Sequence, residues 1–239
     1  GMRADALAAR FPRVALFDLD GTLLDSAPDM VATANRMLGA RGRAPVDAPM
    51  LRQRVSKGAR ALVAAAFPEL DAAGHDALVP EFLQVYREEL GRHSALFEGV
   101  AAMLAALEAD AARWGVVTNK FEYLARDAVA GLGWDGRCQV LVGGDTCAEK
   151  KPHPLPLLEA ARRLGVEPGD CVYVGDDERD MVAGRAAGMA SIAVTWGYRL
   201  EGEDPRTWQA DAIVDHPRQL LDPAAWPTPP SNPSSGARV

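Results

Sequence analysis

Two aspartates, Asp18 and Asp20, stand two residues apart immediately after the apolar run Val14–Phe17. A short apolar run of this kind indicates a buried parallel strand, and ligands bind beyond the carboxyl ends of such strands. Gly21 lets the backbone turn, so the two carboxylates can be aimed at one small site. Like charges held this close need a compensating cation or a shared proton. The pair predicts a divalent-metal site, although an isolated Asp-x-Asp is also typical of a strand that simply runs into a turn.

A second acidic group lies in residues 175–180, between the apolar run Cys171–Val174 and a predicted helix. Asp176 and Asp180 are four residues apart, so they can lie on related faces of the strand end and the first helical turn. The helix dipole alone explains some acids at a helix N-terminus. It does not explain why they gather at the edge where the first pair of aspartates already lies.

Two further polar positions occur at strand-to-helix junctions. Thr118 and Asn119 follow the apolar run Trp114–Val117, and the threonine hydroxyl could donate to a phosphoryl oxygen. An ordinary helix cap is the alternative interpretation. Lys151 lies in the string Lys-Pro-His-Pro before a helix, where it could hold nearby acids ionised and neutralise phosphate charge. A solvated basic pair, formed with Lys150, is the alternative there.

Taken together, these segments resemble the four signatures of the haloacid dehalogenase (HAD) superfamily, in the same order and at similar spacing. The likeness covers about Arg13 to Leu221. The matching positions are Asp18-Leu19-Asp20-Gly21-Thr22, Thr118, Lys151 within Lys-Pro-x-Pro, and Gly175-Asp176 with Asp180.

The resemblance implies a phosphomonoester hydrolase that works through an aspartyl-phosphate. In this family the acid at the Asp18 position is the nucleophile, and the residue at Asp20 acts as general acid and then general base. The implied cofactor is Mg²⁺, held by the Asp18 carboxylate, the Asp20 backbone carbonyl and Asp176. The remaining implied roles are charge stabilisation by Thr118 and Lys151, substrate binding by Asn119, and support from Asp180, Gly21 and Thr22.

The elements that would position these residues alternate between strand and helix from Glu98 onward, which predicts a parallel, doubly wound α/β sheet. Between Leu24 and about Phe97 we expect helices and no strand. The expected division is a Rossmann-like HAD core at 1–23 and 97–222, an all-helical cap at 24–96 and a disordered tail at 223–239. The expected hinges are Leu24–Pro28 and Leu96–Gly99. The predicted strands are 14–17, 114–117, 140–142, 171–174, 190–194 and 212–214, and the predicted helices are 28–41, 48–55, 59–67, 76–90, 100–107, 121–131, 155–164, 181–187 and 217–221.

The cap is where a substrate's leaving group would be recognised, and Ser56, Lys57 and Arg60 are the candidates for that contact. Lys57 and Arg60 are equally well explained as solvated charges on a helix. The overall pattern resembles phosphoglycolate phosphatases. Several stretches look closer to the N-acetylmuramic acid 6-phosphate phosphatases, which leaves two candidate substrates. These stretches are 56–60, 93–97, 175–180, 194–198 and 203–217.

Other relatives fit less well. Dehalogenases lack the second acid, and phosphonate-cleaving members replace it, although their cap carries a lysine that Lys57 could match. Hexose-phosphate mutases commonly have Val where this chain has Thr22. A phosphoacceptor receiver domain would not need the helical insertion or Asp20, and a non-catalytic binding protein is disfavoured because every motif position is intact.

The composition of the chain limits the classes of partner that it could bind. A hydrophobic content of 48% and a charged content of 25% indicate a globular protein with a proper core. The net charge of −7 argues against nucleic acid or an anionic membrane as a partner and leaves a small phosphorylated metabolite. Three cysteines without metal-like spacing fit a reducing cytoplasm, and nothing in the sequence indicates export or membrane insertion. The oligomeric state cannot be predicted.

Overall fold

The computed structural model describes residues 10–227, and its centre is a six-stranded sheet with all neighbouring strands parallel. The strand order is β5-β4-β1-β6-β7-β8, so the predicted doubly wound sheet is confirmed. The strands are β1 (Val14–Phe17), β4 (Arg113–Val117), β5 (Cys138–Val142), β6 (Cys171–Gly175), β7 (Ala190–Val194) and β8 (Ala212–Val214).

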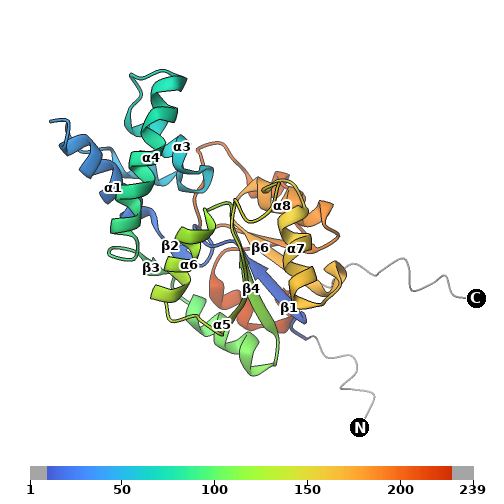
Figure 1. Cartoon of the computed structure of the whole chain (residues 1–239). Coiled ribbons are helices and arrows are strands. Elements are labelled where there is room, and N and C mark those ends of the chain that lie inside the picture. The colour runs from blue at the N-terminus through green and yellow to red at the C-terminus, as the bar shows by residue number, and fades with distance from the viewer. Residues whose placement is uncertain (1–9, 228–239) are drawn as a thin grey trace, which may run out of the picture.

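Helices cover both faces of this sheet (Figure 1). Successive strand residues point to opposite faces, so Ala15 and Phe17 pack in one core cluster and Val14 and Leu16 in another. The first cluster contains α5 (Val100–Ala109) and α6 (Glu122–Gly131), and the second contains α7 (Leu155–Leu164) and α8 (Glu178–Ala186). Short 3-10 turns complete the core: η3 (Pro168–Asp170), η4 (Pro205–Thr207), η5 (Pro217–Leu221) and η6 (Pro223–Ala225).

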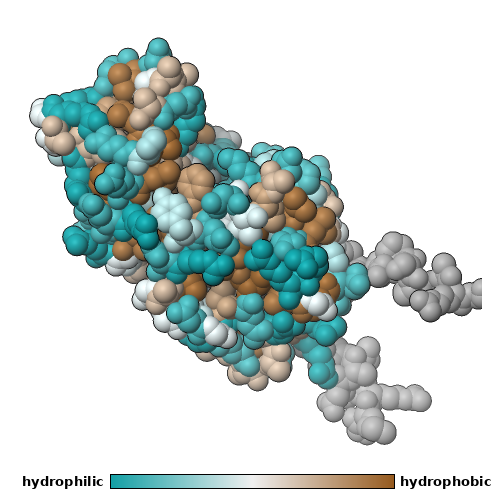
Figure 2. Space-filling model, viewed as in Figure 1, coloured by the Kyte–Doolittle hydropathy of each residue, from teal (hydrophilic) through white to brown (hydrophobic). Residues whose placement is uncertain are grey.

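A separate helical unit lies beyond the carboxyl edge of the sheet, at the upper left of Figure 1. We call it the cap. Its side chains form their own hydrophobic cluster, in which Phe82 and Tyr86 of α4 pack against Met37 of α1 and Leu62 of α3. Figure 2 shows it as a protruding lobe. Its elements are α1 (Ala27–Gly39), α2 (Ala48–Arg52), η2 (Val55–Lys57), α3 (Ala59–Ala66) and α4 (Ala72–Glu89).

The two connections between cap and sheet form a small antiparallel ribbon. Strand β2 (Leu24–Asp25) pairs with β3 (Ala95–Leu96). The expectation of no strand between Leu24 and Phe97 is therefore wrong. Strands of two residues carry no hydrophobic periodicity by which a sequence could reveal them.

The ordered chain continues past Leu221. Trp226 is buried, packs edge-on against Phe11 and Phe17 with ring centroids 6.4 Å apart in each case, and donates from its indole nitrogen to Leu220 O. The disorder predicted from residue 223 is thus wrong for 223–227, and the rest of that prediction lies outside the described residues. Within residues 10–227, we find no helix of the length and apolar character needed to cross a membrane.

The adjacent strands β4, β1 and β6 end next to one another, and the residue after each of these strands is polar. These residues are Thr118, Asp18 and Asp176. The topology thus brings three segments that are far apart in sequence to one edge of the sheet, which is where ligands bind in such folds.

Candidate active site

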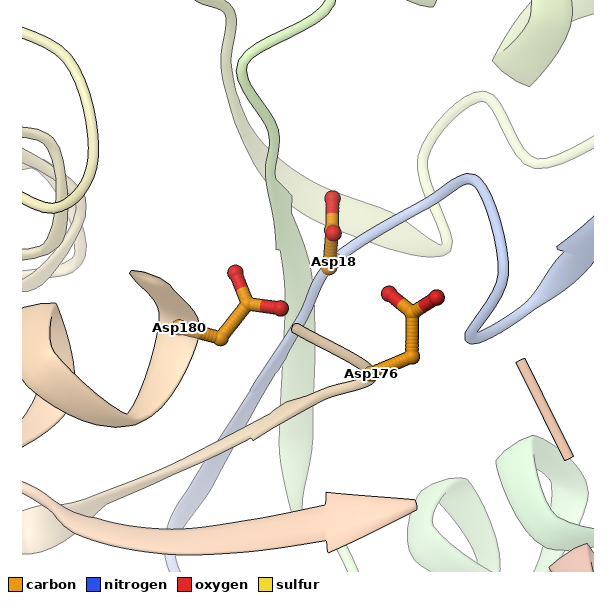
Figure 3. A group of neighbouring side chains, drawn as sticks. All are labelled: Asp18, Asp176 and Asp180. Carbon is orange, nitrogen blue, oxygen red and sulfur yellow. The ribbon is translucent and has the colours of Figure 1, made fainter. Parts of the chain in front are cut away.

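Three aspartates converge at the carboxyl edge of the sheet. Asp18, Asp176 and Asp180 are all buried, and one carboxylate oxygen from each lies within 4.8 Å of the others. Figure 3 shows the three side chains pointing toward a common centre, from the end of β1, the end of β6 and the first turn of α8. The carboxylate of Asp180 joins this set, although Asp180 was not among the predicted metal ligands. The ligand predicted from Asp20 is its backbone carbonyl, and the Asp20 side chain itself contacts Ser26 and Lys120.

A backbone amide and a lysine ammonium both contact one oxygen of the Asp18 carboxylate. Oδ1 accepts a hydrogen bond of 2.8 Å from the Leu19 amide and lies 3.4 Å from the ammonium of Lys151. These contacts fix the rotation of the carboxylate. Burial raises the pKa of Asp18 to about 7 against the opposing effect of Lys151, and the charges of Asp180 and Asp20 act in the same direction as burial.

Lys151 occupies the centre of the buried polar network. Its ammonium donates to Asp180 Oδ1 at 2.7 Å, to the Val117 carbonyl at 3.1 Å and to the Tyr173 hydroxyl at 2.5 Å. Burial alone would lower the pKa of Lys151, but Asp18 and Asp180 raise it. The residue is therefore a fixed positive charge beside Asp18.

Asn119 anchors the segment that carries Lys151. Its side-chain amide donates to the Lys151 carbonyl at 2.8 Å and accepts from the Lys151 amide at 3.0 Å. Asn119 is a predicted substrate-binding residue, and in the structure its side-chain amide lies on the main chain of Lys151. Thr118 is buried at the end of β4, where its hydroxyl accepts from the Lys120 amide at 3.1 Å.

Two residues that were not predicted as site residues donate hydrogen bonds to the Asp20 carboxylate. Ser26 donates to Asp20 Oδ1 at 2.6 Å, and Lys120 donates to Oδ1 at 3.0 Å and to Oδ2 at 3.3 Å. The Lys120 side chain is only 5% exposed, and its ammonium also contacts the hydroxyl of Tyr86 on the cap. Neither an isolated serine nor an isolated lysine carries a spacing signal that would have revealed these contacts.

Asp176 is fully buried and closely surrounded. Its Oδ2 accepts from the Ser56 hydroxyl at 2.7 Å and from the Tyr198 amide at 2.9 Å. A Cβ on Gly21 would overlap the Asp176 carboxylate, and one on Gly197 would overlap both Asp176 and the Gly21 carbonyl. Glycine is therefore required at both positions for the two loops to approach this carboxylate.

The donor set suits a hard divalent cation. Burial, followed by the charges of Asp18 and Asp180, raises the pKa of Asp176 well above its usual value. A lone ammonium, that of Lys151, compensates this group of carboxylates within the described part of the chain. Carboxylate oxygens are the ligands that Mg²⁺ and Ca²⁺ prefer, so the residues present fit such an ion.

Two of the three cap residues predicted to contact the leaving group touch residues of the core. Besides the Ser56 contact with Asp176, Lys57 lies 2.6 Å from Asp177 and 2.9 Å from Glu203. Arg60 pairs with Asp76 instead, and its side chain is 57% exposed. Burial opposes the charge of Lys57, but Asp177 and Glu203 raise its pKa, so the amine is held protonated.

Several known proteins resemble this chain in sequence or in fold. The model of the haloacid dehalogenase-like hydrolase family matches residues 15–194. A phosphoglycolate phosphatase of Xanthomonas campestris pv. campestris is 61% identical over 92% of this chain and 100% of its own length. An N-acetylmuramic acid 6-phosphate phosphatase of Pseudomonas aeruginosa is 45% identical over 88% of this chain and 93% of its own. The crystal structure of a predicted phosphoglycolate phosphatase from Haemophilus somnus superimposes with a TM-score of 0.78 at 28% identity, covering 87% of this chain and 96% of that one.

Proposed function

This chain belongs to the haloacid dehalogenase-like hydrolase family and is a phosphatase, and we propose that it hydrolyses a small phosphomonoester through an aspartyl-phosphate formed on Asp18. The observation that carries the proposal is the position of Asp18. Its carboxylate lies at the end of a central strand, faces Asp176 and Asp180, and has the ammonium of Lys151 at 3.4 Å. A carboxylate in such a setting can act as a nucleophile toward phosphorus.

The first half-reaction transfers the phosphoryl group to the protein. A carboxylate oxygen of Asp18 attacks phosphorus, the bond from phosphorus to the leaving oxygen breaks, and Asp20 gives that oxygen a proton. Leu19 and Lys151 both engage Oδ1, which supports Oδ2 as the oxygen that attacks. Lys151 and the Thr118 hydroxyl offset the charge on the phosphoryl oxygens.

The second half-reaction releases inorganic phosphate. Asp20, now deprotonated, takes a proton from a water that attacks phosphorus, and the bond to Asp18 breaks. Ser26 and Lys120 hold the Asp20 carboxylate in one orientation for both proton transfers. The proton that Asp20 gives to the leaving oxygen is thus returned to it by the attacking water, and the Asp18 carboxylate is regenerated.

We propose Mg²⁺ as the cofactor. Asp18, Asp176 and the Asp20 backbone carbonyl would hold it, with Asp180 near enough to contribute. When bound, the ion would neutralise carboxylate and phosphoryl charge and help to orient the phosphate.

We further propose that residues 24–96 act as a lid over this site. The contacts of Ser56 and Lys57 with the core support a closed arrangement. Closure would exclude all water but the attacking molecule. Because Lys57 is held protonated by two carboxylates, it is poorly suited to form a Schiff base, and this argues against phosphonate cleavage.

For the substrate we propose 2-phosphoglycolate. The 61% identical relative that bears that activity in its name supports this choice, and so does the direct contact of Ser56 with Asp176, which favours a small leaving group. N-acetylmuramic acid 6-phosphate is the second candidate. It is favoured by the 45% identical relative and by the five sequence stretches that resemble that branch.

The test is steady-state hydrolysis of both compounds side by side, with Mg²⁺ and with a chelator. A preference of about a hundredfold or more in kcat/KM identifies the substrate, because such a ratio reflects differential transition-state binding. Equal turnover with and without metal would contradict the proposed magnesium dependence. A lack of turnover of either compound, with other phosphomonoesters hydrolysed, would contradict the proposed substrates.

A further inference from the structure

Tyr198 belongs to two parts of the molecule at once. It follows β7 in the core, yet its side chain is 1% exposed and packs in the hydrophobic cluster of the cap. Its backbone amide, in contrast, donates to Asp176 Oδ2 at 2.9 Å. One residue therefore joins the cap to a carboxylate of the active site.

The side chain of Tyr198 contacts both connections between cap and core. Its hydroxyl donates to Asp25 Oδ1 at 2.5 Å and accepts from the Ala27 amide at 3.0 Å, both on the first connection. Its ring lies against Phe97 of the second connection, with centroids 6.2 Å apart. Burial, together with the bond to Asp25, raises the pKa of Tyr198, so the hydroxyl keeps the proton that it donates.

Further contacts connect the Tyr198 loop to the cap and to the turn after Asp18. Arg52 of the cap lies over the Tyr198 ring, with its guanidinium carbon 4.9 Å from the centroid, and donates to Asp25 at 3.0 Å. On the other side, Trp196 donates from its indole nitrogen to the Thr22 carbonyl at 2.9 Å. Gly197 between them has no room for a side chain against Asp176. The loop 196–198 is thus packed against the turn after Asp18, the Asp176 carboxylate and the cap connections.

We propose that Tyr198 is a positioning residue that couples cap closure to the placement of Asp176. The inference rests on the proposed lid function of the cap. If the first connection shifts, the Tyr198 hydroxyl must shift with it or lose two hydrogen bonds. The amide of the same residue then carries that displacement to Asp176. Closure and assembly of the carboxylate group are therefore linked events.

This coupling has a kinetic signature. When only a fraction of the free enzyme is closed, the apparent dissociation constant of the substrate rises in inverse proportion to that fraction. Removing the Tyr198 hydroxyl weakens the closed state, so KM rises. Saturating substrate restores closure, so kcat is largely retained. A residue whose role was merely to support the fold of the site would instead lower kcat.

The experiment compares Tyr198→Phe with Tyr123→Phe, a matched change at an exposed tyrosine of α6. Steady-state kinetics use p-nitrophenyl phosphate, and hydrogen–deuterium exchange follows peptides covering residues 24–30 and 55–60 in the free protein and with orthovanadate. For Tyr198→Phe we expect KM to rise about tenfold with kcat within about threefold of wild type. We expect faster exchange of both peptides in the free variant and recovery of protection with orthovanadate. Tyr123→Phe should match wild type in every measurement.

Asp25→Ala removes the same hydrogen bond from its other side, together with the Arg52 contact, and should shift KM and exchange in the same direction by at least as much. The proposal is overturned if either variant lowers kcat while KM stays constant, or if exchange of residues 55–60 in the free protein equals that of wild type. The exchange comparison needs no turnover. It therefore decides the coupling even if the wild-type protein fails to hydrolyse phosphomonoesters, which would refute the proposed function separately.

Discussion

The ammonium of Lys57, on the cap, lies 2.6 Å from a carboxylate oxygen of Asp177, on the core. Glu203 provides a second carboxylate at 2.9 Å, and the Lys57 side chain is 18% exposed. The cap and the core are thus joined by a partly desolvated ion pair directly beside Asp176. Such pairs weaken with added salt when solvent reaches them.

The first prediction concerns this ion pair. Lys57→Met should raise KM by about three- to tenfold with kcat nearly unchanged, because the closed state loses two ionic contacts. In the wild type KM should rise as salt is raised from about 0.05 to 0.5 M, and this salt dependence should be much weaker in the variant. Arg60→Met is the control, since Arg60 pairs with Asp76 of the cap itself. An identical salt dependence in wild type and Lys57→Met would refute the role of this pair in closure.

The second prediction concerns Lys120. Lys120→Met removes the ammonium that fixes Asp20 while keeping the side-chain length. Turnover of an alkyl phosphate should fall by about tenfold to a hundredfold, because its leaving oxygen needs the proton of Asp20. The first-turnover release of p-nitrophenol from p-nitrophenyl phosphate should fall much less, since that leaving group needs little protonation.

Lys150→Met is the matched control, because Lys150 is exposed next to the buried Lys151. It should leave both substrates unaffected. Equal losses on the two substrates in Lys120→Met would show that Lys120 acts on the whole site and not through Asp20.

The third prediction links pH, metal and stability. The pKa of Asp18 is raised by burial to about 7, and that of Asp176 is raised in the same direction. A raised folded-state pKa gives a contribution to stability that is complete below the unfolded value and lost as pH rises through the folded value. Metal-free protein should therefore lose the Asp18 contribution between about pH 4 and about pH 7.

Mg²⁺ needs the ionised carboxylates, so its stabilising effect should grow over the same range. Thermal unfolding with Mg²⁺ and with chelator should show a Tm difference of several degrees at about pH 8 and a smaller one at about pH 5.5. Asp176→Asn is the comparison and should lose most of this difference. A Mg²⁺ effect on Tm that was independent of pH would contradict the assignment.

Much of the fold could be predicted from the sequence because the central strands are short, fully buried apolar runs. Val14–Phe17 and Ala190–Val194 are strands in the structure with the predicted bounds. The β2–β3 ribbon could not be predicted, because each strand has two residues. Trp226 falls in the segment predicted to be disordered, and only its packing against Phe11 and Phe17 reveals that it belongs to the core.

The residues of the site, too, could be predicted from the sequence only in part. Asp18, Asp176 and Lys151 follow strands or precede a helix in recognisable strings, and the structure brings them together. Lys120 and Tyr86 meet only through tertiary packing and have no local signature. Asn119 lay in a recognisable string, yet its hydrogen bonds to Lys151 could not be inferred from that string.

Chemical trapping of the phosphorylated enzyme would show whether Asp18 is the nucleophile. Reaction with a phosphomonoester is quenched within milliseconds and treated with borohydride, which reduces an aspartyl-phosphate to homoserine, and peptides are then analysed by mass spectrometry. The proposed mechanism predicts homoserine at position 18 in the wild type, none in Asp18→Asn, and a loss of turnover by about a thousandfold or more in that variant. Homoserine at another aspartate, or near-normal turnover by Asp18→Asn, would contradict it.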